Sequence, residues 1–109
     1  MAFVASLLAS VALSSGLHGT VMRGPTMPVC RVGEPCSAPA ANVPIGFVRN
    51  DRTYATKTDD RGRYRIALAP GTYTIVIAKR YGMSYSPRTV TVPKATFALR
   101  NISIDTGIR

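Results

Sequence analysis

The sequence is poor in the residue types from which catalytic sites are built. Its 109 residues include no tryptophan, one histidine and five acidic residues. His18 has no carboxylate near it in the sequence, and no nucleophile elbow is present, so we expect His18 to be an ordinary strand residue. Asp59 and Asp60 are adjacent and point apart on a strand or open turn, which does not favour an acid and base flanking one bond. We therefore expect no catalytic residues and no enzyme.

Metal-binding signals are equally sparse. Cys30 and Cys36 lack the second cysteine pair or the histidines that a zinc site requires, and the adjacent aspartates are too few for a calcium loop. Gly33 and Pro35 lie between the cysteines and turn the chain back, which predicts a local disulfide in an oxidising compartment, with metal binding as the alternative. So short a loop contributes about 2 kcal/mol on the chain-entropy account, so it rigidifies a loop more than it stabilises a fold. We expect no metal and no cofactor.

Residues 1–16 have the features of a secretory signal peptide. Residues 1–13 are apolar apart from two serines and too short to span a bilayer, and the small residues that follow suit a signal peptidase. No Lys or Arg precedes the apolar run, so a positive n-region is missing unless the true start lies upstream of Met1. The alternatives are an apolar first strand or a helix that binds a partner. We expect a secreted, extracellular or cell-envelope protein without a transmembrane span.

The chain is strongly basic: eleven arginines and three lysines against five acidic residues give a net charge of +9. Outside a cell this balance favours anionic wall polymers, acidic glycans or lipid headgroups as partners. The basic residues are spread from Arg23 to Arg109 instead of forming one block, so solubility alone is the alternative explanation. Arginines interleaved with Tyr54 between residues 49 and 65 would suit nucleic acid if their strands were neighbours. Secretion would make that activity incidental, so nucleic acid is not the expected partner.

The rest of the chain has the two-residue periodicity of β-strands and no helical periodicity. We expect short strands at residues 17–22, 43–48, 53–58, 63–68, 72–77, 88–92 and 97–104. Pro44 suggests that its strand lies at a sheet edge, and a change of parity near Arg100–Asn101 predicts a bulge. The pattern predicts one all-β domain over residues 17–109, an antiparallel sandwich of six or seven strands.

One segment resembles a known family. The string TDDRGRYRIALAPGTYTI, Thr58–Ile75, resembles the strand, Pro-Gly turn and strand hallmark of carboxypeptidase regulatory-like domains. The resemblance implies a seven-stranded sandwich of prealbumin-like, transthyretin-like type, which is grouped with carbohydrate-binding-like folds. The cysteine loop and the ending Ile104–Arg109 are not part of that pattern.

The residues of the hallmark also carry local predictions. Asp59 or Thr58 can accept hydrogen bonds from backbone N–H groups of the turn, and Gly62 frees the backbone to reverse. Tyr64 and Tyr73 lie on strands joined through Pro70–Gly71, so we expect a hairpin whose two tyrosines fill the same core face.

Two functions follow as hypotheses. The first is a non-catalytic module that binds carbohydrate or an anionic envelope polymer. Its candidate residues are Tyr81 and Tyr85, in a polar loop over residues 81–87 with Arg80 and Arg88 beside them. Arg63 and Arg65, on the outer face of a strand, are the other candidates. The tyrosines would instead fold back onto the sandwich edge if they are structural.

The second hypothesis is a structural or protein-docking domain of the envelope without a small-molecule ligand. The segment 24–42 contains four prolines and both cysteines, which predicts a long ordered loop instead of regular structure. An exposed apolar patch around Met27, Val29 and Val32 would favour docking through this loop.

Overall fold

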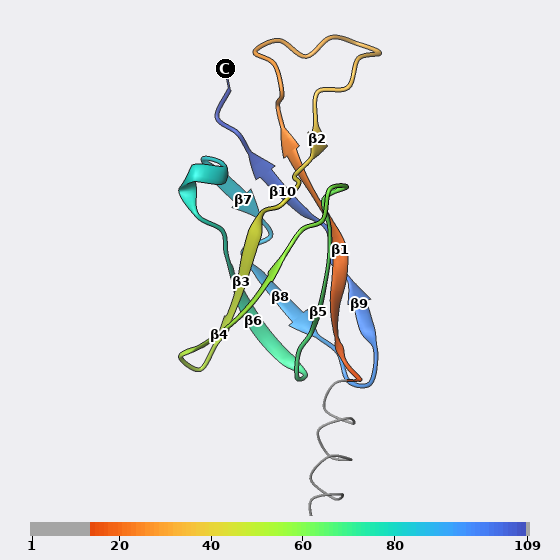
Figure 1. Ribbon diagram of the computed structural model, residues 1–109, viewed down its shortest axis with the longest axis vertical. Helices are drawn as coiled ribbons and strands as arrows, with labels where there is room; N and C mark the ends of the chain where they lie inside the picture. Colours follow the sequence, from red (N-terminus) through yellow and green to blue (C-terminus); the bar gives the residue numbers. More distant parts are fainter. Residues whose placement is uncertain (1–13, 109) are drawn as a thin grey trace, which may run out of the picture.

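Residues 14–108 form two β-sheets packed face to face, as the computed structural model describes them (Figure 1). The predicted all-β sandwich is therefore confirmed. Most of the predicted leader, residues 1–13, lies outside the described residues. Within residues 14–108, no helix is long and apolar enough to cross a membrane. The elements are β1 (Gly16–Gly24), β2 (Ala38–Pro39), β3 (Pro44–Arg49), β4 (Arg52–Lys57), β5 (Arg63–Ala67), β6 (Gly71–Val76), η1 (Lys79–Tyr81), β7 (Ser84–Ser86), β8 (Thr89–Val92), β9 (Phe97–Leu99) and β10 (Ile102–Asp105).

The strands are more numerous than the six or seven expected. Each predicted strand is present, and the last is divided into β9 and β10. The two additional strands, β2 and β7, lie in segments expected to be loops and have only two and three residues. They pair with β1 and β10, respectively. Such short strands carry too few residues for a visible periodicity, so they form only because a neighbouring strand offers backbone partners.

The larger sheet is built around the long strand β1. Its first half, Gly16–Thr20, pairs antiparallel with β5, and Gly16–His18 also pair in parallel with β9. Its second half, Val21–Gly24, pairs in parallel with β10. The sheet is therefore mixed, whereas the sequence predicted antiparallel pairing throughout. After β8, the chain crosses from the smaller sheet to the larger one. There β9 and β10 run parallel to β1.

The bulge predicted near Arg100–Asn101 is absent: Leu99 pairs with His18 and Ile102 with Val21, so no extra residue is inserted where the pairing breaks between β9 and β10. The Arg100 N–H donates to the His18 carbonyl at 2.8 Å, so the chain stays beside β1 through the break. Gly19 lies under this break, and a Cβ there would collide with the Arg100 carbonyl. Beyond the break, Ile102 turns its side chain into the core while Leu99 remains exposed on the outer face. Ala98, Ile102 and Ile104 therefore all face the core with one continuous alternation, and the chain does not change face at the break.

The smaller sheet has the order β4-β3-β6-β8. Asn50 and Asp51 join β3 to β4 with positive φ angles of 51° and 65°, as a two-residue hairpin turn requires. The prediction that Pro44 marks an edge strand is wrong, because β3 lies between β4 and β6. Pro44 is the first residue of β3, beyond the last β6 pair, Gly46 with Val76, so the missing N–H leaves no gap in the β3–β6 ladder.

The Pro70–Gly71 turn does not make the predicted hairpin. It joins β5 of the larger sheet to β6 of the smaller sheet, so Tyr64 and Tyr73 enter the core from opposite sheets. The Tyr73 hydroxyl donates to the Ala69 carbonyl at 2.7 Å, and Arg49 Nη1 donates to the Pro70 carbonyl at 2.7 Å. The Arg49 guanidinium lies on Gly71, where a Cβ would collide with it. These contacts hold the chain as it crosses between the sheets.

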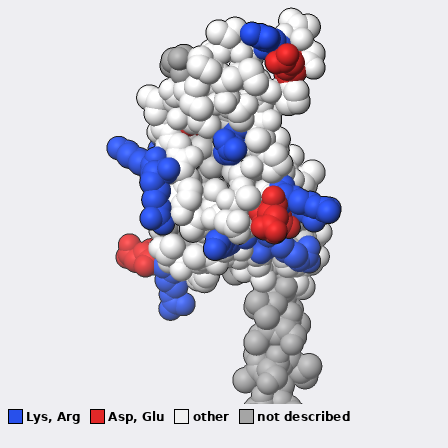
Figure 2. Space-filling model, turned by 45° about the horizontal axis from the view of Figure 1, so that its top comes forward, with Lys and Arg blue, Asp and Glu red and all other residues white. Residues whose placement is uncertain are grey.

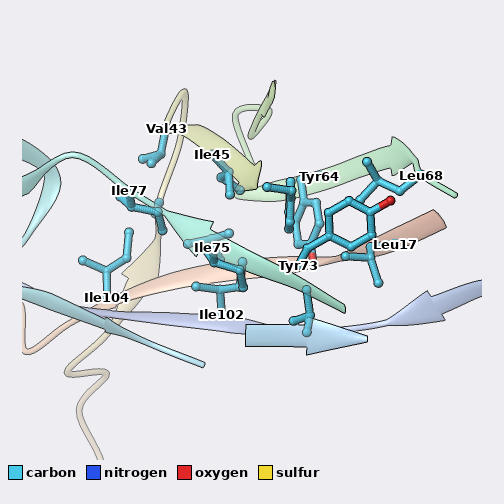
Figure 3. Packing of buried hydrophobic residues seen from close by; sticks show 14 of the residues in the cluster. Leu17, Val43, Ile45, Tyr64, Leu68, Tyr73, Ile75, Ile77, Ile102 and Ile104 are labelled. Atoms are coloured by element: carbon cyan, nitrogen blue, oxygen red, sulfur yellow. The ribbon is translucent and has the colours of Figure 1, made fainter. Parts of the chain in front are cut away.

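The core fills the space between the two sheets (Figure 3). The two largest fully buried side chains, Tyr73 and Phe47, come from the smaller sheet, and Phe47 stacks on Tyr64 of the larger sheet with ring centroids 6.0 Å apart. The core members are Leu17, Val21, Ala40, Val43, Ile45, Phe47, Tyr64, Leu68, Tyr73, Ile75, Ile77, Val90, Val92, Ile102 and Ile104. Most are the alternate strand residues that the sequence periodicity indicated.

Candidate functional site

The four residues expected to bind a ligand lie in two separate places. Tyr81 and Tyr85 belong to η1 and β7, near the end of β10 that pairs with Gly24. Arg63 and Arg65 lie on β5, opposite Thr20 and His18 at the other end of β1. At the rise of a β-strand, the six residue steps from His18 to Gly24 span about 20 Å. The structure therefore does not bring the tyrosines and the arginines into one compact site.

The tyrosine end contains an open hollow of about 490 Å³. Two exposed cations, Lys79 and Arg80, stand beside the half-buried ring of Tyr81. The complete lining is Lys79, Arg80, Tyr81, Gly82, Met83 and Thr106. The Arg80 guanidinium carbon lies 5.0 Å from the Tyr81 ring centroid, within cation–π distance. A hollow that combines two cations with an aromatic wall suits a ligand with negative charge and an apolar or sugar-like face.

Local backbone contacts fix the shape of this hollow. The Tyr81 N–H donates to the Ala78 carbonyl and the Gly82 N–H to the Lys79 carbonyl, which forms the single turn η1. The Met83 N–H then donates to the Asp105 carbonyl at 2.7 Å and begins the β7–β10 pairing. A Cβ on Gly82 would collide with the Ile104 side chain and would lie 2.8 Å from the Asp105 carbonyl oxygen. Only glycine lets the chain come this close to β10.

Thr106 lines the hollow from the C-terminal segment, next to Asp105. Asp105 Oδ1 accepts the Gly107 N–H at 2.9 Å. The Thr106 hydroxyl donates to the Pro25 carbonyl at 2.6 Å and accepts the Ile108 N–H at 3.3 Å. The C-terminal segment, for which the sequence suggested no role, therefore ties the hollow to the end of β1.

Tyr85 is a different kind of residue from Tyr81. Its hydroxyl donates to the Ile75 carbonyl at 2.7 Å, and its ring packs against the core. The Arg88 guanidinium carbon lies 5.1 Å from the ring centroid. Tyr85 therefore closes the sandwich edge between β7 and β6, as the structural alternative for this residue predicted. Tyr81 also packs on the core, but it keeps one side in the hollow.

Arg63 and Arg65 project from the outer face of the larger sheet and already have partners. The Arg65 guanidinium carbon lies 3.8 Å from the ring centroid of Phe97, which covers Gly16 of the intervening strand β1. Arg63 Nε lies 3.4 Å from Asp59 Oδ2, and both side chains are exposed. Hydrogen bonds from the backbone N–H groups of Arg63 and Arg61 to Asp59 lower the pKa of its carboxyl. Asp59 thus organises the β4–β5 turn as the sequence predicted, and Gly62 there has a φ of 76°.

The predicted disulfide is present between Cys30 and Cys36, with Cα atoms 5.5 Å apart. Figure 1 shows their loop projecting beyond the ends of β1 and β2. Val29 and Val32 in this loop are exposed, with Val32 completely so. The bridge therefore stiffens a projecting loop with apolar side chains at its surface.

Basic side chains are otherwise distributed over the surface. On the face seen in Figure 2, Lys and Arg occur in several separate places. Among residues 14–108, no three His, Cys, Asp or Glu side chains gather into a group that could hold a metal ion. Neither Lys79 nor Arg80 forms an ion pair with a carboxylate of these residues, whereas Arg63 does. A ligand anion in the hollow would therefore not have to displace a carboxylate from either cation.

The sequence indicated part of this hollow and missed the rest. Tyr81 and its neighbour Arg80 were visible as an aromatic residue beside a cation. Met83 and Thr106 were missed as lining residues, because the β7–β10 pairing that brings their segments together has no local signal. Lys79 follows the predicted strand 72–77, and that position gave no sign of a binding role.

Comparison of the chain with family models, with curated proteins and with solved structures gave no match.

Proposed function

We propose that this protein is a secreted, non-catalytic binding module of the carboxypeptidase regulatory-like type, and that its ligand is an acidic carbohydrate or another anionic polymer of the cell envelope. The observation that carries the proposal is the hollow in which Lys79 and Arg80 stand beside Tyr81. A sugar ring stacks on an aromatic side chain, and its carboxylate or phosphate substituents are attracted to the two cations. The all-β sandwich and the net charge of +9 support the same conclusion.

Arg63 and Arg65 serve as a second contact for a ligand that is long. They lie near the other end of β1, about 20 Å away along the strand, so a polymer chain reaches both places and a short oligosaccharide does not. A polymer gains avidity from two contacts on one molecule, even when each contact is weak.

The proposal is tested by calorimetric titration of the full chain with a soluble polyuronate and with a neutral glucan. The polyuronate is expected to bind and the glucan not, and binding is expected to weaken as salt rises because exposed charges are screened. Lys79→Ala/Arg80→Ala should weaken binding at least tenfold. Lys94→Ala/Arg52→Ala removes the same net charge elsewhere and should have a smaller effect. Equal affinity of the two double variants would contradict a site at the hollow.

The extracellular location is a separate part of the proposal and has its own measurement. Intact mass of the protein from its native host, before and after reduction, should show loss of the leader and a gain of two hydrogens on reduction. A cell-retained, reduced chain that keeps residues 1–16 would overturn secretion and leave the fold unaffected.

Docking to an envelope protein is the second candidate, and the exposed Val29 and Val32 on the disulfide loop favour it. Apolar contacts survive high salt, whereas contacts between exposed charges do not. If the loop is the docking element, washed envelopes should retain the protein in concentrated salt and should release the Val29→Ser/Val32→Ser variant. Release of both proteins by salt would favour the anionic polymer.

A further inference from the structure

Strand β4 is an edge strand that the sandwich leaves open. It pairs with β3 on one side and ends the order of the smaller sheet. Five of its six residues are exposed, so neither face of the strand is covered along most of its length. On the face of β4 that points toward the core, the Tyr54 ring packs edge to face on the Tyr73 ring, with the ring centroids 6.0 Å apart. Tyr54 nevertheless remains exposed to solvent.

The opposite sheet covers only the last part of this edge. The Thr56 hydroxyl donates to the Arg65 carbonyl of β5 at 3.3 Å, which joins the two sheets at that point. From there the two strands diverge toward the hairpin turn at Asn50–Asp51, which projects at the lower left of Figure 1. The open part of the edge therefore extends from Arg52 to Ala55.

The register shows which backbone groups point away from β3. The two-residue turn makes Arg49 and Arg52 the closing pair, so the pairs that exchange hydrogen bonds are Arg49 with Arg52 and Phe47 with Tyr54. The alternation of an antiparallel ladder then directs the N–H and C=O groups of Thr53 and Ala55 outward. The hydrogen bond from the Thr58 N–H to the Val43 carbonyl follows the same alternation further along. Two residues thus offer a donor and an acceptor each to an added strand.

The charges on β4 select among the possible partners. Arg52 and Lys57 stand at its two ends, and the strand contains no acidic residue. A second copy that pairs through the same outward groups would place Thr53 opposite Ala55 and Arg52 opposite Thr56, so β4 itself supplies no carboxylate to either cation. Arg52 and Lys57 lie on opposite faces of the sheet, so a partner segment with an acidic residue opposite each of them would place one carboxylate beside each cation.

We propose that the open edge of β4 accepts an extended acidic segment of another protein as an added strand. The backbone of Thr53 and Ala55 supplies the hydrogen bonds, and Arg52 and Lys57 select for carboxylates. This interface lies apart from the hollow beside Tyr81 and does not depend on the ligand bound there.

The test uses two six-residue synthetic peptides with a valine core, one with glutamate and one with lysine at both ends, because Arg52 and Lys57 lie at the two ends of β4. Amide hydrogen exchange of the full, disulfide-bonded chain is followed residue by residue by NMR. The valine–glutamate peptide at saturation should slow exchange at Thr53 and Ala55 at least tenfold. The amides of Tyr54 and Thr56, which face β3, should change little. The valine–lysine peptide should have no effect on any of them.

Two variants separate the backbone contribution from the charge contribution. Ala55→Pro removes an N–H that points away from β3, so the β3–β4 ladder is retained while peptide protection is lost. Arg52→Glu/Lys57→Glu should reverse the preference, so that the valine–lysine peptide protects Thr53 and Ala55. Unchanged exchange at Tyr54 in each variant shows that the sheet is intact.

Three results would overturn the proposal. One is a saturating valine–glutamate peptide that leaves the Thr53 and Ala55 amides exchanging at their free rate. Another is equal protection by both peptides. The third is a concentration-dependent dimer in which these amides are already protected without peptide, since β4 would then pair with a second copy.

Discussion

The side-chain Oδ1 of Asn101 accepts a hydrogen bond from the backbone N–H of Thr20 at 3.0 Å. The bond lies at the break between β9 and β10, where the carbonyl of a neighbouring strand would otherwise serve as the acceptor. Together with the bond from Arg100 to the His18 carbonyl, it keeps both strands beside β1. One side chain thus bridges the gap in the ladder between β9 and β10, and the last part of the chain stays in register with β1.

Loss of this acceptor should destabilise the sheet at its centre. Asn101→Ala is expected to lower the free energy of unfolding by about 0.5–1.5 kcal/mol, the net value of one hydrogen bond, as measured by urea denaturation. Exchange of the Thr20 amide should accelerate. Asn101→Asp retains an acceptor oxygen and should cost less. Equal losses for the two variants would show that the Thr20 bond does not account for the effect.

Tyr64 should make stability fall at alkaline pH. Its hydroxyl donates to the Arg100 carbonyl at 2.5 Å, and burial raises its pKa to about 12, while the nearby Arg100 charge opposes this rise. A folded-state pKa above the unfolded value near 10 means that the folded state holds the proton more tightly. The contribution is complete below pH 10 and is lost as pH rises toward 12. Tyr64→Phe should be less stable at pH 8 and lose less stability between pH 10 and 12, as followed by denaturation at each pH.

The same experiment has an optical control. Absorbance of ionised tyrosine should show a step near pH 12 in the wild-type protein, and this step should be missing in Tyr64→Phe. A wild-type protein whose tyrosines all ionise near pH 10 while it remains folded would contradict the assignment.

The stability of the protein should be sensitive to a methyl group added at Gly16 and nearly insensitive to one added at Gly46. A Cβ on Gly16 would collide with the Ile66 carbonyl and lie 2.6 Å from the Phe97 ring, which stacks under Arg65. Gly16→Ala should therefore cost about 1–3 kcal/mol or more, as overpacking does. Gly46→Ala meets the Thr53 methyl at 3.3 Å, a contact that a small side-chain shift relieves. It should stay within about 0.5 kcal/mol of wild type, since removing glycine also reduces the entropy of the unfolded chain.

Thermal unfolding measures both glycine variants on the same scale. A Gly46→Ala protein as destabilised as Gly16→Ala would show that the loss comes from strand glycines in general. In that case the crowding of Phe97 and Ile66 around Gly16 would not be the cause.

Removal of the disulfide should act locally. The bridge closes a short projecting loop, so Cys30→Ser/Cys36→Ser should cost at most about 2 kcal/mol of global stability. Arg31, which lies between the two cysteines, should instead become a faster site of tryptic cleavage, detected by mass spectrometry of the intact chain. Global unfolding of the variant at room temperature would show that the bridge supports the sandwich itself.

The sequence by itself determined the strand content, most strand positions and the turns. Alternation of apolar and polar residues marks which side of a strand is buried, as at Tyr73 and Ile75, and this information is local. Positive-φ turns such as Asn50–Asp51 and the carboxylate-organised turn at Asp59 are likewise set by a few adjacent residues. The disulfide followed from the short spacing of its two cysteines.

Only the tertiary structure decided which strands are neighbours. The parallel pairing of Val21 with Ile102, the crossing of Pro70–Gly71 between sheets and the joining of Met83 to Asp105 all depend on segments that are distant or on opposite sheets. A two-residue periodicity assigns a face to each side chain but no partner to each strand, because the backbone groups that pair are the same in every residue. The hollow beside Tyr81 and the open edge of β4 result from those pairings. Neither feature could be predicted from the sequence, because both depend on which strands pair in the folded protein.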